Sequence, residues 1–297
     1  MRSDGDSWSI VDSVGLTALG VATFRALESS EPDALVRDEF APWFVAAAGE
    51  PHFTAMLADP TSVGDIFSDP SAALVSVRTK FFDDFFLSAA ASGVRQAVIL
   101  AAGLDARAYR LDWPPDTTVF EIDQPKVLEF KGKVLAEHEA RPKADRRPVA
   151  VDLRDDWPAA LEAAGFDPTK PVAWSAEGLL PFLPGTAHDA LFSRIDELSP
   201  PGSRVVVDNY AGGGDIQRFA EAREKYFDKN LFGAIDITEL LYSDERADPS
   251  LWLAEHGWTV QDEYPFELAA RYRRTVAKLP EELADLSKRW IYATAVK

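Results

Sequence analysis

The sequence predicts an α/β fold in which a mostly parallel sheet is covered by helices on both faces. Five short runs within residues 94–210 are apolar at successive positions, and segments with helical spacing separate most of them. Runs that are apolar on both faces of a strand are typical of parallel strands buried between layers of helices. Residues 1–93 show helical spacing only, so we expect a helical part ahead of the sheet.

The N-terminal helices come first. Apolar residues recur at helical spacing in residues 10–29, 34–48 and 70–92. The third segment carries boundary signals, because Asp69 or Ser71 can cap its start and Gly93 can end it in a left-handed conformation. No strand pattern precedes Val94.

The sheet follows. The predicted strands are residues 96–102, 117–123, 147–153, 171–178 and 203–210, with helices at 125–139, 156–165 and 186–198. Two later runs, 258–264 and 290–296, are expected to close the sheet. We expect a single domain over residues 1–297, made of a helical part (1–93), a ligand-binding core (94–210), a helical insertion that forms a lid (211–256) and closing strands (257–297).

The net charge, the cysteine count and the N-terminal sequence exclude several kinds of partner and site. The net charge of −18 repels phosphate backbones and anionic membranes, so nucleic acid is not an expected partner. There are no cysteines, which excludes disulfides, zinc–thiolate sites and thiol nucleophiles. No secretory signal is present, and the apolar stretch VGLTALGVATFRAL is too short to span a bilayer. We therefore expect a cytoplasmic protein without a membrane span.

The turn AAG at residues 101–103 follows the first predicted strand, where ligands bind in open parallel sheets. A pyrophosphate would require a loop with three glycines, and only Gly103 is present, with Arg107 and Tyr109 occupying the following positions. One glycine still allows the backbone to approach a ligand closely. The turn therefore suits a nucleoside without phosphates better than NAD or a nucleoside triphosphate.

Two acids end the second predicted strand. Glu121 and Asp123 lie about twenty residues past the glycine, where a carboxylate binds ribose hydroxyls in nucleoside-binding folds. They are two positions apart, so on an ideal strand both point to the same face. A solvated strand end is the alternative explanation.

Other polar residues follow the same pattern. Asp152 and Leu153 end the third strand, where the acid could accept from an adenine amino group, although it could instead belong to a helix cap shared with Asp155 or Asp156. Glu177 lies in the apolar segment WSAEGLLPFLP and needs a partner, either a ligand amine or a basic side chain.

Arg78 lies in a helix with apolar neighbours (VRTKFF) and could bind a carboxylate through two hydrogen bonds, although a lone helical arginine is more often a surface residue.

The motifs RTKFFDDF, VILAAGLDARAYRL, FEIDQPKVLEFK, VDLRDDWPAAL and SAEGLLPFLP resemble those of the leucine carboxyl methyltransferase family. Within it, they are similar to an actinobacterial branch of S-adenosylmethionine-dependent methyltransferases, of which the N-terminal DGDSWSIVDSVGLTAL is also typical. The resemblance implies a Rossmann-like class I methyltransferase fold, with a seven-stranded, mostly parallel sheet and an antiparallel last strand.

The same resemblance implies S-adenosyl-L-methionine as the cofactor. Gly103 would lie against it, and Asp123, with Glu121, would bind the ribose. Arg78 would bind the methionine carboxylate and Glu177 would lie near the methionine amine. The adenine would lie between Asp152 and Leu153.

The methyl acceptor is less defined by the sequence. A carboxylate needs no base, whereas a hydroxyl would benefit from one. No catalytic residue stands out. The candidate bases are His52, His138, His188 and His256, although a surface or packed histidine is the more common explanation for each. Tyr210, beside Gly212–Gly214, could contact the acceptor instead.

Aromatic residues in the N-terminal helices and the insertion suggest an apolar or lipid-like small molecule as acceptor, although aromatic residues at helical spacing more often form plain core. They are Trp43, Phe44, Phe82, Phe219, Tyr226, Phe227, Phe232 and Tyr242. The alternatives to a methyltransferase are a nicotinamide-dependent oxidoreductase, which the missing pyrophosphate loop disfavours, and a catalytically silent relative that binds S-adenosylmethionine or a partner.

Overall fold

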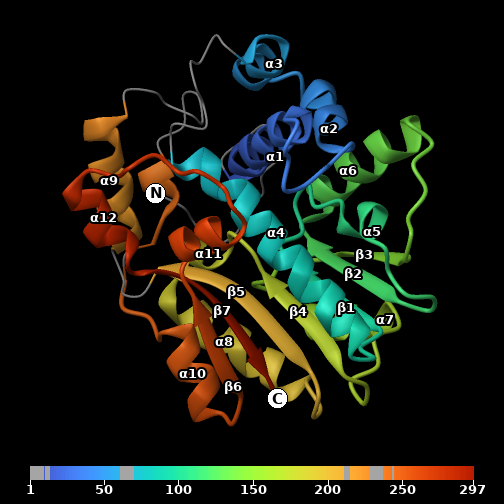
Figure 1. The fold of residues 1–297 in the computed structure, drawn as a ribbon. Helices are drawn as coiled ribbons and strands as arrows, with labels where there is room; N and C mark the ends of the chain where they lie inside the picture. Colours follow the sequence, from blue (N-terminus) through green and yellow to red (C-terminus); the bar gives the residue numbers. More distant parts are fainter. Residues whose placement is uncertain (1–9, 11–13, 61–69, 211–214, 228–236, 243) are drawn as a thin grey trace.

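One sheet of seven strands organises the protein (Figure 1). The computed structural model describes residues 10, 14–60, 70–210, 215–227, 237–242 and 244–297. The strands are β1 (Gln96–Leu100), β2 (Thr118–Asp123), β3 (Asp145–Ala150), β4 (Val172–Ala176), β5 (Arg204–Tyr210), β6 (Thr259–Glu263) and β7 (Trp290–Val296). Their order is β3-β2-β1-β4-β5-β7-β6. Only the pairings of β7 with β5 and with β6 are antiparallel, which confirms the predicted fold class.

The central strands are buried on both faces, as the continuous apolar runs predict. Every residue of β1 and of β4 is buried. In β5, Val206 packs into the core on one face of the sheet, while Val205 and Val207 pack into the core on the other. This alternation is the two-residue period of a strand that has helices on both sides.

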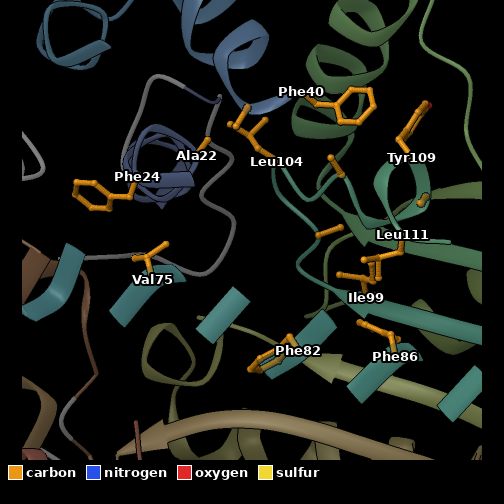
Figure 2. Packing of buried hydrophobic residues seen from close by; sticks show 14 of the residues in the cluster. Ala22, Phe24, Phe40, Val75, Phe82, Phe86, Ile99, Leu104, Tyr109 and Leu111 are labelled. Atoms are coloured by element: carbon orange, nitrogen blue, oxygen red, sulfur yellow. The ribbon is translucent and has the colours of Figure 1, made fainter. Parts of the chain in front are cut away.

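The N-terminal helices and two later ones cover the first face. They are α1 (Val14–Ser30), α2 (Ala41–Ala48), α3 (Pro51–Ala58), α4 (Pro70–Ala91), α6 (Pro125–Glu137) and α11 (Pro265–Arg271). Helix α4 crosses the sheet diagonally (Figure 1). Its side chains Phe82 and Phe86 share a core with Ile99 of β1 and Phe24 of α1 (Figure 2).

The second face is covered by α7 (Trp157–Ala163), α8 (Gly185–Glu197) and α10 (Pro249–Glu255). Trp157 packs edge-on against Trp174 of β4, with ring centroids 6.0 Å apart. Helix α10 contacts β6, β7 and α8, and so belongs to the layer that covers the sheet. The remaining described part of the expected lid is η4 (Ile237–Leu240) and α9 (Asp215–Tyr226), which packs on α12 (Glu281–Ser287). We therefore restrict the lid proposal to α9 and η4.

Some boundaries differ from the sequence-based expectation. The segment 34–48 does not form one helix, because the Asp38 carboxylate accepts hydrogen bonds from the amides of Phe40 and Ala41 and starts α2 there. Strand β3 ends at Ala150, so Asp152 and Leu153 lie beyond the sheet. The candidate cap Asp69 lies outside the described residues, whereas Gly93 has the expected left-handed conformation, with φ +95°.

Candidate functional site

A cavity of about 380 Å³ opens at the carboxyl ends of the parallel strands. Residues that follow β1, β2, β3 and β4, and the last residues of β5, line it, together with residues of α1, α4 and α9. This is the edge at which open α/β sheets bind ligands. The cavity contains six of the seven residues that the sequence singled out: Arg78, Gly103, Asp123, Asp152, Leu153 and Glu177.

The turn after β1 brings the backbone close to the cavity. Ala101 and Gly103 both have positive φ, at +51° and +46°. A Cβ atom at Gly103 would lie 3.5 Å from the Cβ of Ala18 on α1, an ordinary van der Waals contact, so it is the positive φ that favours glycine here. The short segment α5 (Arg107–Arg110) follows this turn, and no long helix begins there.

Asp123 is held in place by backbone amides. Its Oδ2 accepts from the amide of Gly103 at 2.6 Å, and its Oδ1 accepts from the amide of Gln124 at 2.6 Å. Burial raises the pKa of Asp123 to about 6. The Asp123 carboxylate thereby joins the end of β2 to the turn after β1 at the cavity wall.

Glu121 does not reach the cavity, which differs from the expectation that both acids share one site. Its side chain is fully buried and forms ion pairs with Lys131 of α6, at 2.8 Å, and with Arg146 of β3, at 2.7 Å. The two acids share a face of β2, but α6 covers the position of Glu121 and leaves only the strand end open. We therefore exclude Glu121 from the proposed site.

Asp152 and Leu153 line the cavity beside Gln124. The Asp152 carboxylate accepts from Arg154 Nε at 2.9 Å and from Gln124 Nε2 at 2.7 Å. It is not the cap of α7, because Asp156 has that role and accepts from the amide of Ala159. The structure therefore places Asp152 at the cavity wall, with both carboxylate oxygens already hydrogen-bonded to Arg154 or Gln124.

Arg78 of α4 and Glu177, which follows β4, form an ion pair that lines the cavity. Arg78 Nε donates to Glu177 Oε1 at 3.0 Å, and Arg78 Nη1 donates to Asp208 Oδ2 at 3.0 Å. The partner of Glu177 is thus a basic side chain, one of the two options that the sequence left open. Arg78 Nη2 has no acceptor among the described residues, so it remains able to bind a ligand carboxylate.

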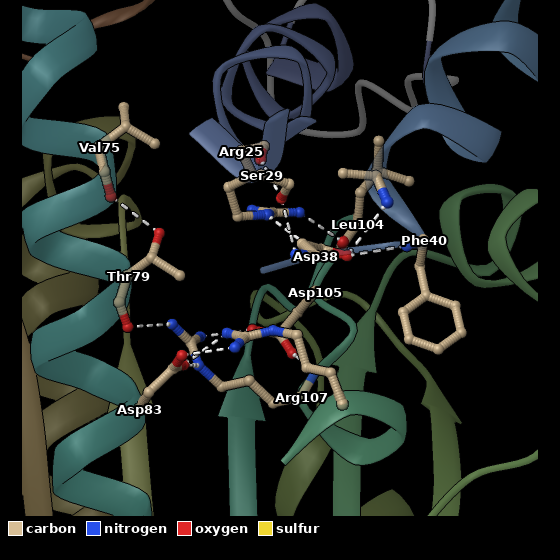
Figure 3. A network of polar contacts seen from close by, with 12 residues as sticks. Arg25, Ser29, Asp38, Phe40, Val75, Thr79, Asp83, Leu104, Asp105 and Arg107 are labelled. Atoms are coloured by element: carbon tan, nitrogen blue, oxygen red, sulfur yellow. Dashed lines mark hydrogen bonds and ion pairs between the residues drawn. The ribbon is translucent and has the colours of Figure 1, made fainter. Parts of the chain in front are cut away.

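Arg107 extends this pair into a buried network that sequence reasoning missed (Figure 3). Its Nη1 donates to Glu177 Oε2 at 2.8 Å and also contacts Asp105, and its Nε donates to Asp83 Oδ1 at 2.7 Å. Although burial alone would raise the pKa of Glu177, the guanidinium groups of Arg107 and Arg78 hold it below its usual value.

Asp208 is the second missed residue. Its Oδ1 accepts from the amide of Gly178 at 2.6 Å, so it fixes the loop after β4 as well as Arg78. Burial raises the pKa of this carboxyl. The signal in the sequence was an acid near the end of a strand, in VVVDNY, the same signal that marks Asp123.

The ion-paired cluster around Arg78 and Arg107 contains more carboxylates than guanidinium groups. Four carboxylates are joined to three guanidinium groups through ion pairs: Asp83, Asp105, Glu177 and Asp208, with Arg78, Arg107 and Arg110. With every acid ionised, this cluster carries one excess negative charge beside the cavity. Buried charge of one sign favours a ligand of the other.

The part of the cavity beside β5, β7 and α9 is lined mainly by apolar and aromatic side chains, and we call it the apolar end. Tyr210 stacks on Trp290, with ring centroids 5.2 Å apart and planes at 21°, and Phe219 of α9 lies 5.6 Å from Tyr210. All three line the cavity, as do Ile216 and Tyr242.

Of the aromatic residues expected at an acceptor site, Phe219 and Tyr242 are present. The others differ: Trp43 stacks on His138, Phe44 and Phe82 are core residues, Tyr226 is exposed, Phe227 packs beside α9, and Phe232 and Gly212–Gly214 lie outside the described residues.

None of the four histidines lines the cavity. His188 is buried and its Nε2 lies 2.8 Å from the carbonyl of Leu180, while His256 stacks on Trp252. Tyr210 does line the cavity, but burial raises its pKa well above the usual value, so it does not serve as a base near neutral pH.

Helix α1 covers the turn that follows β1. Arg25 Nη2 donates to the carbonyl of Leu104 at 2.7 Å, and Arg25 Nε donates to Asp38 Oδ2 at 2.8 Å (Figure 3). Arg25, Ala18 and Val21 of the same helix line the cavity. Helix α1 thus forms part of the cavity wall.

Comparisons with known proteins identify the family to which this chain is similar. The family model of leucine carboxyl methyltransferase matches residues 18–196. A protein of Rhodococcus jostii (strain RHA1) is 70% identical over the full length of both chains. One of Mycobacterium tuberculosis (strain H37Rv) is 49% identical, over all of this chain and 97% of its own. Both are named as candidate S-adenosyl-L-methionine-dependent methyltransferases.

Among solved structures, a candidate methyltransferase from Thermobifida fusca YX is 16% identical with a TM-score of 0.49, over 93% of this chain and 94% of that one.

In the part of the chain that the structure describes, no helix has the length and apolar character needed to cross a membrane. The extent of the family match and the full-length similarity to its relatives lead to one conclusion: this chain belongs to the leucine carboxyl methyltransferase family.

Proposed function

We propose that this protein transfers a methyl group from S-adenosyl-L-methionine to a carboxylate or hydroxyl oxygen of an apolar small molecule. One observation carries the proposal: a single cavity joins a polar end, with Asp123, Gly103 and the Arg78–Glu177 pair, to an apolar end with stacked aromatic rings. The expected cytoplasmic location stays a prediction from the sequence.

The polar end fits the cofactor group by group. The ionised Asp123 accepts hydrogen bonds from the ribose hydroxyls, and the turn at Gly103 has no phosphate to enclose. Asp152 and Leu153 hold the adenine, the first by accepting from its amino group and the second by packing on the ring. Arg78 Nη2 binds the methionine carboxylate, and Glu177 attracts the amine from between its two arginines.

The charges fit as well. S-adenosylmethionine supplies an electrophilic methyl group on a sulfonium, and its sulfonium, amine and carboxylate together give one net positive charge. The ion-pair cluster around Glu177 has one excess negative charge. Binding therefore offsets the excess charge of this cluster, which favours the positively charged sulfonium form over the thioether product.

The chain contributes to the reaction by alignment and by excluding water. Helix α1 with Ala18 and helix α9 with Phe219 enclose the two ends of the cavity. Holding both reactants in line converts an encounter in solution into a reaction within one complex, which by itself accounts for much of the acceleration.

The absence of a suitable base favours a carboxylate over a hydroxyl. Among the described lining residues at the apolar end, Glu224 is exposed on α9 and Asp208 is engaged by Arg78 and Gly178. A carboxylate is already ionised: its oxygen forms the new C–O bond, the S–CH₃ electron pair stays on sulfur, and no proton has to leave.

The test has two steps. Calorimetric titration with S-adenosylmethionine should show binding that Asp123→Ala weakens, whereas the control Asp116→Asn should bind like the parent. Asp116 is an exposed acid at the opposite end of β2, with a positive φ that asparagine tolerates.

Transfer of radiolabelled methyl to matched acids and alcohols (octanoate and octanol, hydrocinnamate and hydrocinnamyl alcohol) then tests the reaction. A protein that binds the cofactor and methylates none of them would contradict the proposal and favour the silent relative.

A further inference from the structure

The side-chain nitrogen of Asn209 is buried at the cavity without a hydrogen-bond acceptor. Asn209 is 3% exposed, and its Nδ2 has no acceptor among the residues that the structure describes. Among the described residues, eleven others have a buried side-chain nitrogen or oxygen without a hydrogen bond, two of these atoms (Lys131 Nζ and Arg146 Nη2) being in ion pairs, and none of those eleven residues lines the cavity. Buried donors in native proteins are normally satisfied, so an unsatisfied donor beside a cavity indicates a ligand atom.

The position of Asn209 along the sheet indicates which ligand it would meet. The groups proposed for the cofactor follow β3 (Asp152), β2 (Asp123), β1 (Gly103) and β4 (Glu177), which are consecutive in the sheet order. The next strand is β5, and Asn209 is its penultimate residue. The adenosine and methionine thus occupy four neighbouring strand ends, and the fifth lies next to the methionine.

The surroundings of Asn209 belong to the apolar end of the cavity. The side chains of Asn209 and its chain neighbour Tyr210 leave β5 on opposite faces, but both residues line the cavity. Tyr210 stacks on Trp290, and the segment with Pro181 and Phe182 contacts β5 and lines the same cavity. Asp208, on the other side, is already bound by Arg78. Asn209 is therefore a buried polar group in a wall that is largely aromatic and aliphatic, whereas the charged lining residues Arg223 and Glu224 belong to α9.

We infer that Asn209 binds the methyl acceptor, its Nδ2 donating to an oxygen of the acceptor while the Tyr210–Trp290 stack supports the apolar body. This inference rests on the proposed function. The amide donates to a carboxylate or hydroxyl oxygen without removing a proton, so it orients the oxygen toward the methyl group and leaves its lone pair free to form the bond. Asn209 is thus an acceptor-binding residue, and the cofactor does not depend on it.

The test compares Asn209→Leu with Ser175→Ala. Ser175 on β4 is also fully buried with an unpartnered hydroxyl, but it does not line the cavity. Three quantities are measured: the melting temperature, the affinity for S-adenosylmethionine by calorimetry, and methyl transfer to octanoate and hydrocinnamate over a range of acceptor concentrations. Asn209→Asp is the third variant, since it keeps the shape and removes the donor.

If Asn209 binds the acceptor, its variants should change acceptor kinetics without losing stability or cofactor affinity. Asn209→Leu melts at or above the temperature of the parent, because an unsatisfied donor has been removed. It binds S-adenosylmethionine as the parent does, and it loses about tenfold or more in kcat/KM for the acceptor, mostly through KM. Asn209→Asp loses as much, and Ser175→Ala retains parental transfer. Binding of hydrocinnamate to the S-adenosylhomocysteine complex, measured by calorimetry, weakens in parallel.

Other results would overturn the inference. A lower melting temperature in Asn209→Leu with an unchanged acceptor KM would mean a structural role, and weaker binding of S-adenosylmethionine would assign Asn209 to the cofactor. Unchanged transfer in both Asn209 variants would also exclude it. If the parent protein binds S-adenosylmethionine but methylates no acceptor, the proposed function itself is contradicted. The inference about Asn209, which rests on that function, is then contradicted as well.

Discussion

The Arg107 guanidinium donates to Glu177 Oε2 at 2.8 Å, joining the segment after β1 to the loop after β4. The same carboxylate accepts from Arg78 through its other oxygen. Glu177 is therefore fixed from two sides before any ligand arrives, and its position is a property of the folded chain. Polar groups that are already oriented lose little freedom on binding.

Arg78 should be important for both affinity and stability. We expect Arg78→Ala to weaken S-adenosylmethionine binding by about tenfold to a hundredfold, because a charge-assisted hydrogen bond contributes about 1.5 to 3 kcal/mol. It also leaves Asp208 without its cation, so the melting temperature should fall. Arg78→Lys should recover part of the stability and less of the affinity, because lysine cannot make two parallel hydrogen bonds. Calorimetry and thermal melting check both, and equal affinities in all three proteins would contradict the role.

Cofactor affinity should depend on the proton of Asp123. The pKa of this carboxyl is about 6 in the free protein, and ribose hydroxyls donate to its ionised form. Binding therefore displaces a proton, and affinity should rise about tenfold between about pH 5 and 7 and then level off. Titrations in buffers with different heats of ionisation measure the proton released. Asp123→Asn should show neither effect, and proton release retained in that variant would assign the titration to another group.

Glu121 should matter for folding and not for binding. Removing its charge leaves Lys131 and Arg146 buried without their carboxylate. We expect Glu121→Gln to lower the free energy of unfolding by about 3 to 5 kcal/mol. The affinity of the folded variant for S-adenosylmethionine should stay within about threefold of the parent. Urea denaturation and calorimetry separate the two quantities, and a large loss of affinity in folded protein would return Glu121 to the site.

His188 should make the fold sensitive to mild acid. Burial, with the charge of Arg246 adding to it, lowers the pKa of His188 below its usual value. The unfolded chain therefore takes up this proton first, so the contribution is fully present above about pH 6.5 and is lost as the pH falls through the folded pKa. Between about pH 7 and 5 the parent should lose more stability than His188→Gln. Parallel melting curves for the two proteins would contradict this prediction.

Much of the fold was predictable because its signals are local. The apolar runs of β1 and β4 and the capping glycine at Gly93 depend on residues close in sequence. The two acids of β2 show the limit of such reasoning. The two-residue period places Glu121 and Asp123 on one face, but only the packing of Lys131 from α6 decides that the first is enclosed and the second open.

The missed residues have the same physical explanation. Arg107 and Asp208 act through partners 70 and 30 residues away, Glu177 and the amide of Gly178. Nothing near either residue in the sequence indicates such pairing. An arginine close to the first turn and an acid near the end of the fifth strand were visible as residue types, but their roles depend on which strands become neighbours in the sheet.

The bond from Arg25 to the carbonyl of Leu104 has a consequence for the N-terminal helix itself. Helix α1 is attached to the turn on which the cofactor is proposed to lie, and it also forms a wall of the cavity. By thermodynamic reciprocity, a ligand that gains free energy from a closed α1 must return the same free energy to α1 as resistance to local opening. Slower hydrogen exchange at the α1 amides would therefore report occupancy of the cavity, even for a ligand that touches no backbone atom of that helix.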